Sequence, residues 1–203
     1  RRVLFRSGRI KCIVGLGYMA QLTKEILENA EQFSTEYVAS QTPEWVAERQ
    51  FLIAISNVQI KQQIVEFLDQ HNAHYFTLIG KQNSIHSYDN IGQGSFINYC
   101  NHLISNPQIG RHCIITSYCQ ISWNVKINDF CHISAYSYIN NTEIGTGSVL
   151  GVRSTIVGKP YITIADYCNF IVNSVVNKDI NVSGTYFGNR KLSDCSSLTN
   201  QIL

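Results

Sequence analysis

Two groups of residues in this chain have types and spacing suited to chemistry: a glycine turn near its start and a histidine in its second half. The apolar run 10–14 leads into Gly15-Leu16-Gly17-Tyr18-Met19, and helix-forming residues with apolar spacing follow at 22–30. This pattern is typical of a strand, a glycine turn and a helix. Backbone N–H groups at such a helix N-terminus can bind a phosphate, so Gly15 to Met19 are candidate nucleotide-binding residues.

A polar pair follows a later expected strand. Residues 51–55 are predicted to form a strand that ends in Ser56-Asn57, with a helix at 59–71 after it. Ligands of open α/β sheets bind beyond the carboxyl ends of the strands, so both residues are expected beside the glycine turn; they could equally cap the helix. Another strand is expected at 37–39, and because no acidic residue stands at its end, the sequence disfavours NAD.

A repeat sets the elements that position the second group. From Ile79 onward every sixth residue is aliphatic: Ile79, Ile85, Ile91, Ile97, Leu103, Ile109, Ile115, Ile121, Ile127, Ile133 and Ile139. A six-residue period with an apolar head predicts a hexapeptide β-helix, in which three hexads make one triangular coil of about 18 residues.

The fifth residue of each hexad should also point inward, near a corner, and should be small. These positions hold Ser95, Asn101, Pro107, Cys113, Cys119, Val125, Cys131 and Ser137. The cysteines among them are therefore expected to be core residues rather than metal ligands or redox groups. After Ile139 the period slips by one residue to Ile144, and an insertion at 159–163 is predicted to form a loop off one corner.

The order of these segments resembles the bacterial sugar acyltransferases typified by sialic acid O-acetyltransferase and UDP-4-amino-sugar N-acetyltransferase. The resemblance covers residues 8–191 and includes a Leu-Ile-Gly connector at 78–80 and a terminal Gly-Asn segment at 188–189. Its most specific motifs are Ile127-Asn128-Asp129-Phe130-Cys131-His132-Ile133 and Ser174-Val175-Val176-Asn177-Lys178-Asp179-Ile180.

The resemblance implies a small Rossmann-like α/β domain at 8–78 that binds the sugar nucleotide, an all-β left-handed parallel β-helix at 79–191, and a C-terminal tail at 192–203. It also implies a homotrimer that transfers an acyl group, acetyl by expectation, from acyl-coenzyme A to an amino or hydroxyl group of a nucleotide-activated sugar in surface-glycan biosynthesis. Acetyl-CoA would be a co-substrate, held by His132, Gly151, Val152, Asn173 and Lys178.

The general base of the family is missing. Relatives carry a His followed by Asp or Glu nine residues before the position of His132, and here those catalytic positions hold Trp123 and Asn124. Neither an indole nor a carboxamide accepts a proton near neutral pH, and losing a positioned base typically costs roughly 10²- to 10⁴-fold in rate. The Gly-His pair that relatives carry after the glycine turn is Tyr18-Met19 here.

The chemistry then has alternatives. His132 could act as the base or orient the thioester. A sugar amine could instead arrive unprotonated and give its proton to the departing thiolate, with backbone N–H groups near Gly151 and Val152 stabilising the oxyanion. Trp123 would be a stacking platform for a ring, or a plug against the neighbouring subunit. The alternative to an enzyme is an inactive homologue that acts as a trimeric scaffold or sugar-nucleotide binder.

Composition and charge exclude other classes. Residues 1–7 back-translate into a DNA-sequencing adapter and are interpreted as an artefact; without their three arginines the formal charge of +2 falls by three to −1, so nucleic acid is not an expected partner. No apolar run approaches the roughly 20 residues that span a bilayer, so a cytoplasmic protein without membrane insertion is expected. His102, His112 and His132 fall at different phases of the coil, and no metal site is predicted.

Overall fold

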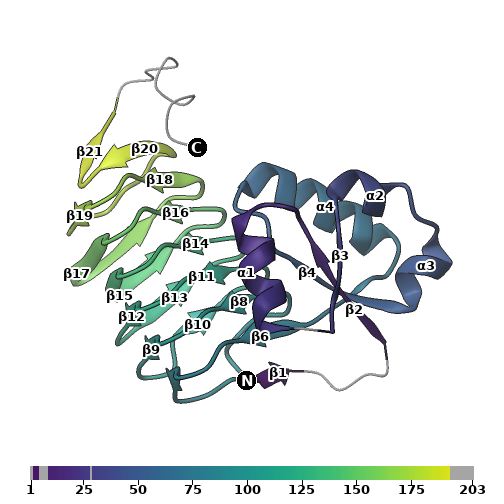
Figure 1. The fold of residues 1–203 in the computed structure, drawn as a ribbon. Helices are drawn as coiled ribbons and strands as arrows, with labels where there is room; N and C mark the ends of the chain where they lie inside the picture. Colours follow the sequence, from purple (N-terminus) through teal and green to yellow (C-terminus); the bar gives the residue numbers. More distant parts are fainter. Residues whose placement is uncertain (1, 5–8, 28, 193–203) are drawn as a thin grey trace.

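The computed structural model describes residues 2–4, 9–27 and 29–192, which form an α/β unit seated on one side of a β-helix (Figure 1). The elements of the α/β unit are β2 (Ile10–Val14), α1 (Tyr18–Ile26), β3 (Glu31–Phe33), α2 (Thr35–Ala39), α3 (Pro43–Ala47), β4 (Arg49–Ile53), α4 (Val58–Gln70) and β5 (His74–Tyr75). The strands make a parallel sheet in the order β3-β2-β4-β5. None of the helices in the described ranges is long and apolar enough to cross a membrane.

Alternate residues of this sheet face two different cores. Ile13 and Leu52 pack in the cluster that contains α1 and reaches the β-helix, whereas Cys12 and Phe51 pack on the opposite side with α4. Both faces of the sheet are therefore buried, as expected for a parallel sheet with crossover helices.

Several boundaries differ from the expected ones. Segment 37–39 lies in α2 and not in a strand, because Ser34 caps a helix there: its Oγ accepts a hydrogen bond from the N–H of Tyr37 at 3.1 Å. The strand in question is β3, six residues earlier. Helix α1 begins directly after Gly17, four residues before the predicted start, and β4 begins two residues before its predicted start. Helix α4 confirms the predicted helix within one residue.

The β-helix has three faces, which we call first, second and third in chain order. The first face contains β6 (Thr77–Ile79), β8 (Phe96–Ile97), β11 (Ile114–Ile115), β14 (His132–Ile133), β16 (Val149–Leu150), β18 (Cys168–Phe170) and β20 (Gly184–Phe187). The second contains β7 (Ser84–Ile85), β9 (His102–Leu103), β12 (Gln120–Ile121) and β19 (Val175–Val176), and the third contains β10 (Gln108–Ile109) and β13 (Val125–Ile127). Two longer strands, β15 (Tyr138–Ile144) and β17 (Thr155–Ile164), run from the second face to the third.

Antiparallel strands pair with both ends of the first face. Strand β1 (Arg2–Leu4), which belongs to the segment interpreted as an artefact, pairs with β6, and β21 (Arg190–Lys191) pairs with β20. All other pairs in the β-helix are parallel.

The predicted aliphatic ladder is confirmed as the core of the β-helix. Its residues from Ile97 to Ile139 are buried in one cluster, which continues through Ile144, Leu150, Ile156, Ile164, Phe170 and Val176. The small fifth-position residues are buried as well, including Cys113, Cys119 and Cys131. Burial raises the pKa of the Cys119 thiol to about 11, which leaves it protonated and unreactive at neutral pH.

The irregularities of the repeat lie in β15 and β17. The predicted one-residue slip is confirmed, because β15 carries both Ile139 and Ile144 inward. The insertion does not leave the corner as an irregular loop: β17 continues through it, and residues 158–161 stand opposite Asn141 between the pairs Asn140↔Val157 and Thr142↔Ile162. The extra residues are absorbed as a bulge because the flanking pairs stay in register.

Each corner of the triangle is a row of residues with positive φ. The first corner carries Gln82, Cys100, Tyr118, Tyr136, Arg153 and Asn173; the second carries Asn106, Asn124 and Asn141; the third carries Gly94, His112, Phe130, Gly147 and Tyr167. Asparagine and glycine tolerate this conformation best. Stacking supports bulkier residues at two corners: Tyr118 lies 5.1 Å from Tyr136, and His112 lies 5.3 Å from Phe130.

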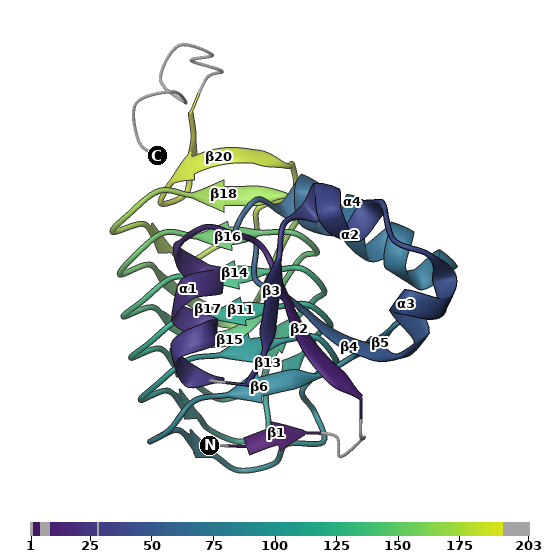
Figure 2. The same ribbon diagram turned by 45° about the vertical axis from the view of Figure 1, so that its right-hand side comes forward.

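The α/β unit packs on the first face and the third corner. Leu78, Phe96 and Ile114 form an outward row on the first face, and they are buried in the cluster that contains α1. Figure 2 shows α1 lying over the strands of this face. Helix α4 reaches the third corner, where Lys61 donates a hydrogen bond to the carbonyl O of His112 at 3.2 Å.

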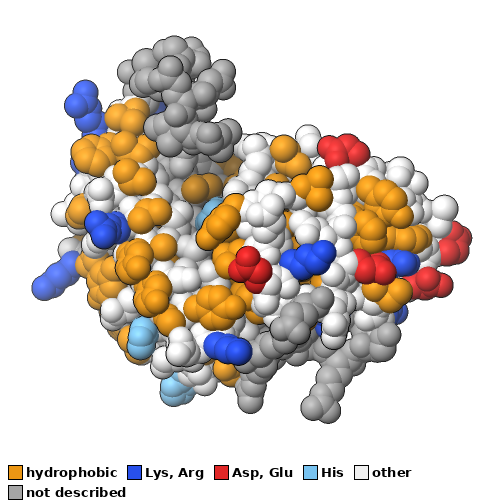
Figure 3. Space-filling model, viewed as in Figure 1, with side chains coloured by type: hydrophobic (Ala, Val, Ile, Leu, Met, Phe, Trp, Pro, Cys, Tyr) orange, Lys and Arg blue, Asp and Glu red, His pale blue; other side chains and the backbone are white. Residues whose placement is uncertain are grey.

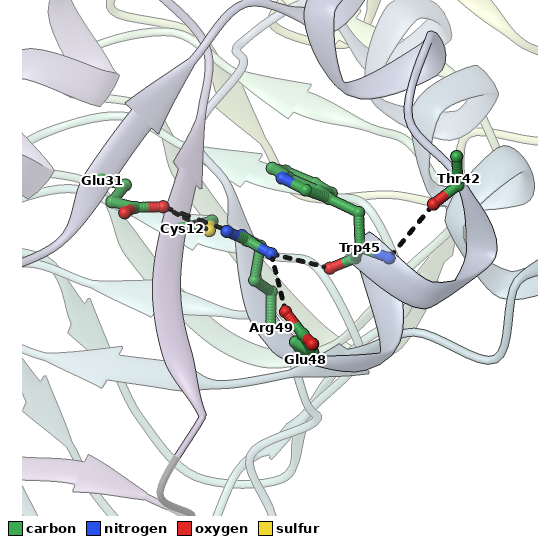
Figure 4. A network of polar contacts seen from close by, with 6 residues as sticks. All are labelled: Cys12, Glu31, Thr42, Trp45, Glu48 and Arg49. Atoms are coloured by element: carbon green, nitrogen blue, oxygen red, sulfur yellow. Dashed lines mark hydrogen bonds and ion pairs between the residues drawn. The ribbon is translucent and has the colours of Figure 1, made fainter.

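A polar network closes the end of the α/β sheet remote from the glycine turn (Figure 4). The guanidinium of Arg49 lies 4.1 Å over the ring of Trp45 and donates a hydrogen bond to its carbonyl O at 3.1 Å. It also pairs with Glu31 at 3.7 Å and Glu48 at 3.6 Å. These contacts link β3, α3 and β4 where the apolar core ends, and Cys12, buried beside Glu31, has its pKa raised to about 12.

The ladder predicts a large difference between inward and outward aliphatic residues. Ile115→Ala should lower the free energy of unfolding by about 2–5 kcal/mol, because it leaves a cavity in the β-helix core. Ile104→Ala is the matched control, since Ile104 is 41% exposed, and should change stability by less than about 0.5 kcal/mol. Urea unfolding measures both; equal midpoints for the two variants would contradict the assignment of the core.

Candidate active site

A cavity of about 550 Å³ lies where the α/β unit meets the first face, and we call it pocket 1. Its walls are the glycine turn, the segments after β3 and β4, the start of α4 and one histidine of the β-helix. The lining residues are Gly15, Leu16, Gly17, Tyr18, Met19, Ser34, Thr35, Glu36, Ala54, Ile55, Ser56, Ile60 and His132. All five predicted residues of the glycine turn are therefore gathered with Ser56 and His132.

The glycine turn needs its first glycine. Gly15 has a φ of +129°, and a Cβ there would lie 3.0 Å from the carbonyl O of Ala54. The turn is fixed by hydrogen bonds from the Gly15 N–H to the Phe33 carbonyl at 2.8 Å and from the Gln32 side chain to the Gly15 carbonyl at 2.9 Å. Gly17 caps α1 without a side chain, which leaves first-turn N–H groups for a bound anion.

An acidic residue of pocket 1 was missed by the sequence interpretation. Glu36 lies three residues after the end of β3, in the first turn of α2, and it lines the pocket. The expectation that no acid follows the second strand, on which NAD was disfavoured, is therefore wrong. Hydrogen bonds from the backbone and from Ser34 and Thr35 lower the pKa of Glu36, which keeps it ionised. A carboxylate at this place can accept hydrogen bonds from ribose hydroxyls. Its separation of about 20 residues from the glycine turn was the available signal.

The polar pair after β4 has two different roles. Ser56 lines pocket 1 as expected. Asn57 instead caps α4, because its Oδ1 accepts a hydrogen bond from the N–H of Ile60 at 3.0 Å, and it does not line the pocket.

His132 enters pocket 1 because of its place in the β-helix. It follows Leu78, Phe96 and Ile114 in the outward row of the first face, on the next rung beyond Ile114. The α/β unit covers the earlier members of this row, and His132 is the member that borders the cavity.

The surroundings of His132 keep its ring neutral. Burial, with the charge of Lys61 as a second cause, lowers the pKa of His132 to about 4. Lys61 itself is 1% exposed, and burial lowers its pKa to about 8. A neutral imidazole has one N–H donor and one acceptor nitrogen, which suits it to orienting a carbonyl; its low basicity makes it a poor proton acceptor at pH 7.

The other predicted catalytic positions lie elsewhere. Trp123 and Asn124 are at the second corner, which is opposite the first face, and they line a separate cavity. Asn124 has a φ of 52° and its side chain donates to the Oδ1 of Asn141 at 2.7 Å. Within one chain they therefore share no site with His132.

The predicted acyl-CoA residues are divided as well. Gly151, Val152 and Asn173 lie at the first corner and Lys178 at the second, and none of the four lines pocket 1 or the cavity at Trp123. The N–H of Gly151 is bonded to the carbonyl O of Phe170 at 2.7 Å, so it is not free to stabilise an oxyanion. Hydrophobic side chains gather over the β-helix on the side shown in Figure 3. The side chains of Val152 and Val172, at the first corner, are exposed.

The three histidines that the metal hypothesis considered lie on different parts of the coil. His102 points outward from the second face, His112 is buried at the third corner, and His132 borders pocket 1. In the described ranges no three His, Cys, Asp or Glu side chains are grouped as metal ligands.

The influence of Lys61 on His132 can be measured. Lys61→Met removes a buried positive charge, so protonation of His132 becomes easier and its pKa should rise from about 4 toward its ordinary range, but only part of the way because burial remains. NMR titration of the histidine ring, assigned with His132→Gln, reads this directly. Lys126→Met removes a positive charge from the third face and should leave the pKa of His132 unchanged. Equal pKa values of His132 in the unchanged chain, Lys61→Met and Lys126→Met would refute the coupling.

Several solved structures share this fold. The acetyltransferase domain of PglB from Neisseria gonorrhoeae FA1090, in complex with acetyl coenzyme A, has a TM-score of 0.76 and 18% identity over 92% of this chain and 100% of that chain. A mutant of GDP-perosamine N-acetyl transferase from Caulobacter crescentus, with CoA and GDP-perosamine, has a TM-score of 0.75 and 15% identity over 93% and 99%. PerB from Caulobacter crescentus, also with CoA and GDP-perosamine, has a TM-score of 0.75 and 15% identity over 92% and 99%.

No family model matches the sequence, and no curated protein matches it. The structural similarity confirms the predicted fold class. The chain has the fold of the bacterial sugar N-acetyltransferases: a parallel α/β unit followed by a left-handed parallel β-helix.

Proposed function

We propose that this protein transfers an acetyl group from acetyl-CoA to an amino or hydroxyl group of a nucleotide-activated sugar, whose nucleotide occupies pocket 1. The observation that carries the proposal is the meeting of the glycine turn, Glu36, Ser56 and His132 around one cavity. The turn and α1 suit a phosphate, the carboxylate suits a ribose, and the histidine stands where the sugar would continue. The solved proteins of the same fold bind acetyl-CoA, or CoA with GDP-perosamine.

The reaction proceeds without a protein base when the acceptor is an amine. The unprotonated nitrogen attacks the thioester carbonyl, the new C–N bond forms, and the C–S bond breaks from the tetrahedral intermediate. The departing thiolate takes the proton that the nitrogen loses. His132, neutral at pH 7, donates a hydrogen bond to the carbonyl oxygen as negative charge develops on it.

This route fits the residues at the former base positions. Trp123 has an indole that cannot accept a proton, and the amide of Asn124 is engaged with Asn141. A hydroxyl acceptor would need a base to remove its proton, so the proposal favours an amine over a hydroxyl.

The active form is proposed to be a homotrimer with its substrates between copies. In support, Trp123 and His132 occupy positions that the family resemblance assigns to one site, yet they lie on opposite sides of one β-helix. A site that contains both would therefore draw them from two chains. Closed cyclic symmetry gives every copy the same arrangement.

A sugar-nucleotide binder without acyl transfer is the second candidate. It is favoured by the same two positions, Trp123 and Asn124, and by the occupied N–H of Gly151. This candidate keeps pocket 1 and loses only the chemistry.

Release of the CoA thiol tests the proposal. The full chain should release thiol from acetyl-CoA only when a UDP- or GDP-linked 4-amino sugar is present. His132→Gln should slow release by roughly 10²-fold, the typical loss of one oxyanion donor. His102→Gln, which changes an exposed histidine of the second face, should leave the rate unchanged.

Two negative results have different meanings. Calorimetric binding of the nucleotide sugar without thiol release would identify the inactive binder. Absence of both binding and release would refute the assignment of pocket 1.

A further inference from the structure

A buried histidine joins the two parts of the molecule at the third corner. His112 is 1% exposed, and its ring lies edge-on to Tyr75 of β5 at 4.5 Å and stacked on Phe130 at 5.3 Å. Its carbonyl O accepts the hydrogen bond from Lys61 of α4 at 3.2 Å. Two elements of the α/β unit therefore contact the β-helix at His112, and we call His112, Tyr75, Phe130 and Lys61 the corner contact.

The ring of His112 is enclosed without hydrogen bonds. Within the described ranges neither its Nδ1 nor its Nε2 has a hydrogen-bond partner. On the preceding rung lies Gly94, where a Cβ would collide with the ring. An imidazolium has two N–H donors and a charge that need solvent or partners, whereas a neutral imidazole is buried at a much smaller cost. The corner contact therefore strongly favours the neutral ring.

The charged groups around the ring also oppose its protonation. Lys61 lies at its carbonyl, and Arg111 precedes it in the chain. Asp69 of α4 carries the opposite charge, but it accepts a hydrogen bond from the hydroxyl of Tyr75 at 2.7 Å and pairs with Arg111 at 3.8 Å. Burial first, and then the charges of Arg111 and Lys61, lower the pKa of His112 to about 3.

We propose that the corner contact is a pH-sensitive switch: protonation of His112 separates the α/β unit from the β-helix and so opens pocket 1. The walls of pocket 1 belong to both parts, with the glycine turn on one side and His132 on the other. Separation therefore weakens the binding of any ligand that contacts both walls. The inference goes beyond the proposed function, because it concerns the contact between the parts and not the reaction.

The direction of the pH effect follows from the two protonation states. In the separated state the ring of His112 reaches water and has its ordinary pKa of about 6.5, so it binds a proton below that pH. In the closed state the ring stays neutral down to a pH of about 3. The closed state therefore has its full stability above pH 6.5 and loses it as the pH falls from 6.5 towards 3. Between pH 7 and pH 5 the equilibrium should shift towards separation by roughly 25-fold.

Thiol labelling of the covered face tests the switch in the whole chain. Ile114 is 1% exposed under α1, so the thiol of Ile114→Cys should react when the α/β unit moves away. Mass spectrometry locates the label, and its rate is divided by that of a model thiol at each pH. Between pH 7 and pH 5 this ratio should rise roughly 25-fold more with His112 in place than with His112→Phe added. An equal rise in both proteins would overturn the proposal.

The design separates the switch from other effects of acid. His132, whose pKa is also lowered, is present in both proteins, so its contribution cancels. Phenylalanine suits position 112, because Phe130 of the same corner also has a positive φ. His102→Phe removes an exposed histidine of the second face and should leave the rise in labelling unchanged. Cys119 points into the core of the β-helix, and labelling of Cys119 in parallel with position 114 would mean that acid unfolds the whole chain, which would overturn the switch.

A second measurement needs no reporter cysteine. Urea unfolding of the unchanged chain and of His112→Phe gives two unfolding constants at each pH. Their ratio should change by roughly 25-fold between pH 7 and pH 5, with the unchanged chain losing more stability, because only its unfolded state gains a proton at position 112. A constant ratio would overturn the proposal.

The two proposals fail separately. Thiol release from acetyl-CoA, together with an equal acid-induced rise in labelling with and without His112, would refute the switch alone. A difference in labelling without thiol release would refute acyl transfer alone.

Discussion

Burial of one aliphatic side chain in every six residues is the constraint on which this molecule depends. A two-residue strand cannot stand alone, but each inward residue, from Ile97 to Val176, meets its equivalents on the rungs above and below. The same periodicity places corner residues in a left-handed conformation that asparagine and glycine adopt readily. The six-residue spacing therefore determines both which residues are buried in the core and which residues adopt the left-handed conformation at the corners.

The outward row of the first face connects the two parts of the molecule. Its apolar members are buried under α1, and its histidine completes a pocket whose other walls belong to the α/β unit. Lys61 adds an electrostatic link, since the buried ammonium that anchors α4 at the third corner also disfavours a proton on His132. Packing and the protonation state of the site thus have a common origin in the contact between the two parts.

The repeat was predictable from the sequence because every hexad carries its own local signal. The glycine turn and Ser56 were also predictable from local signals, because each directly follows an apolar run that reads as a strand. Glu36 was missed because β3 is only three residues long and begins with Glu31 and Gln32, which carry no strand periodicity. The separation of Trp123 from His132 could be predicted from their places in the hexads. Trp123 stands two residues after the inward residue Ile121, at a corner, whereas His132 stands directly before the inward residue Ile133, on a face. The burial of Lys61 had no signal in the sequence, since it depends on how α4 meets the third corner.

The regular spacing of the early coils fixes the position of His132 on the first face. Leu78, Phe96, Ile114 and His132 are each 18 residues apart, and only beyond His132 do the steps change, to 17 residues at Val149 and 20 at Asn169. A single-residue deletion between positions 80 and 131 would turn His132 from the outward row toward the core and empty that side of pocket 1. Changes of length after position 133 leave the histidine in place, so the coils beyond it are the part of the chain free to vary in length without disturbing the site.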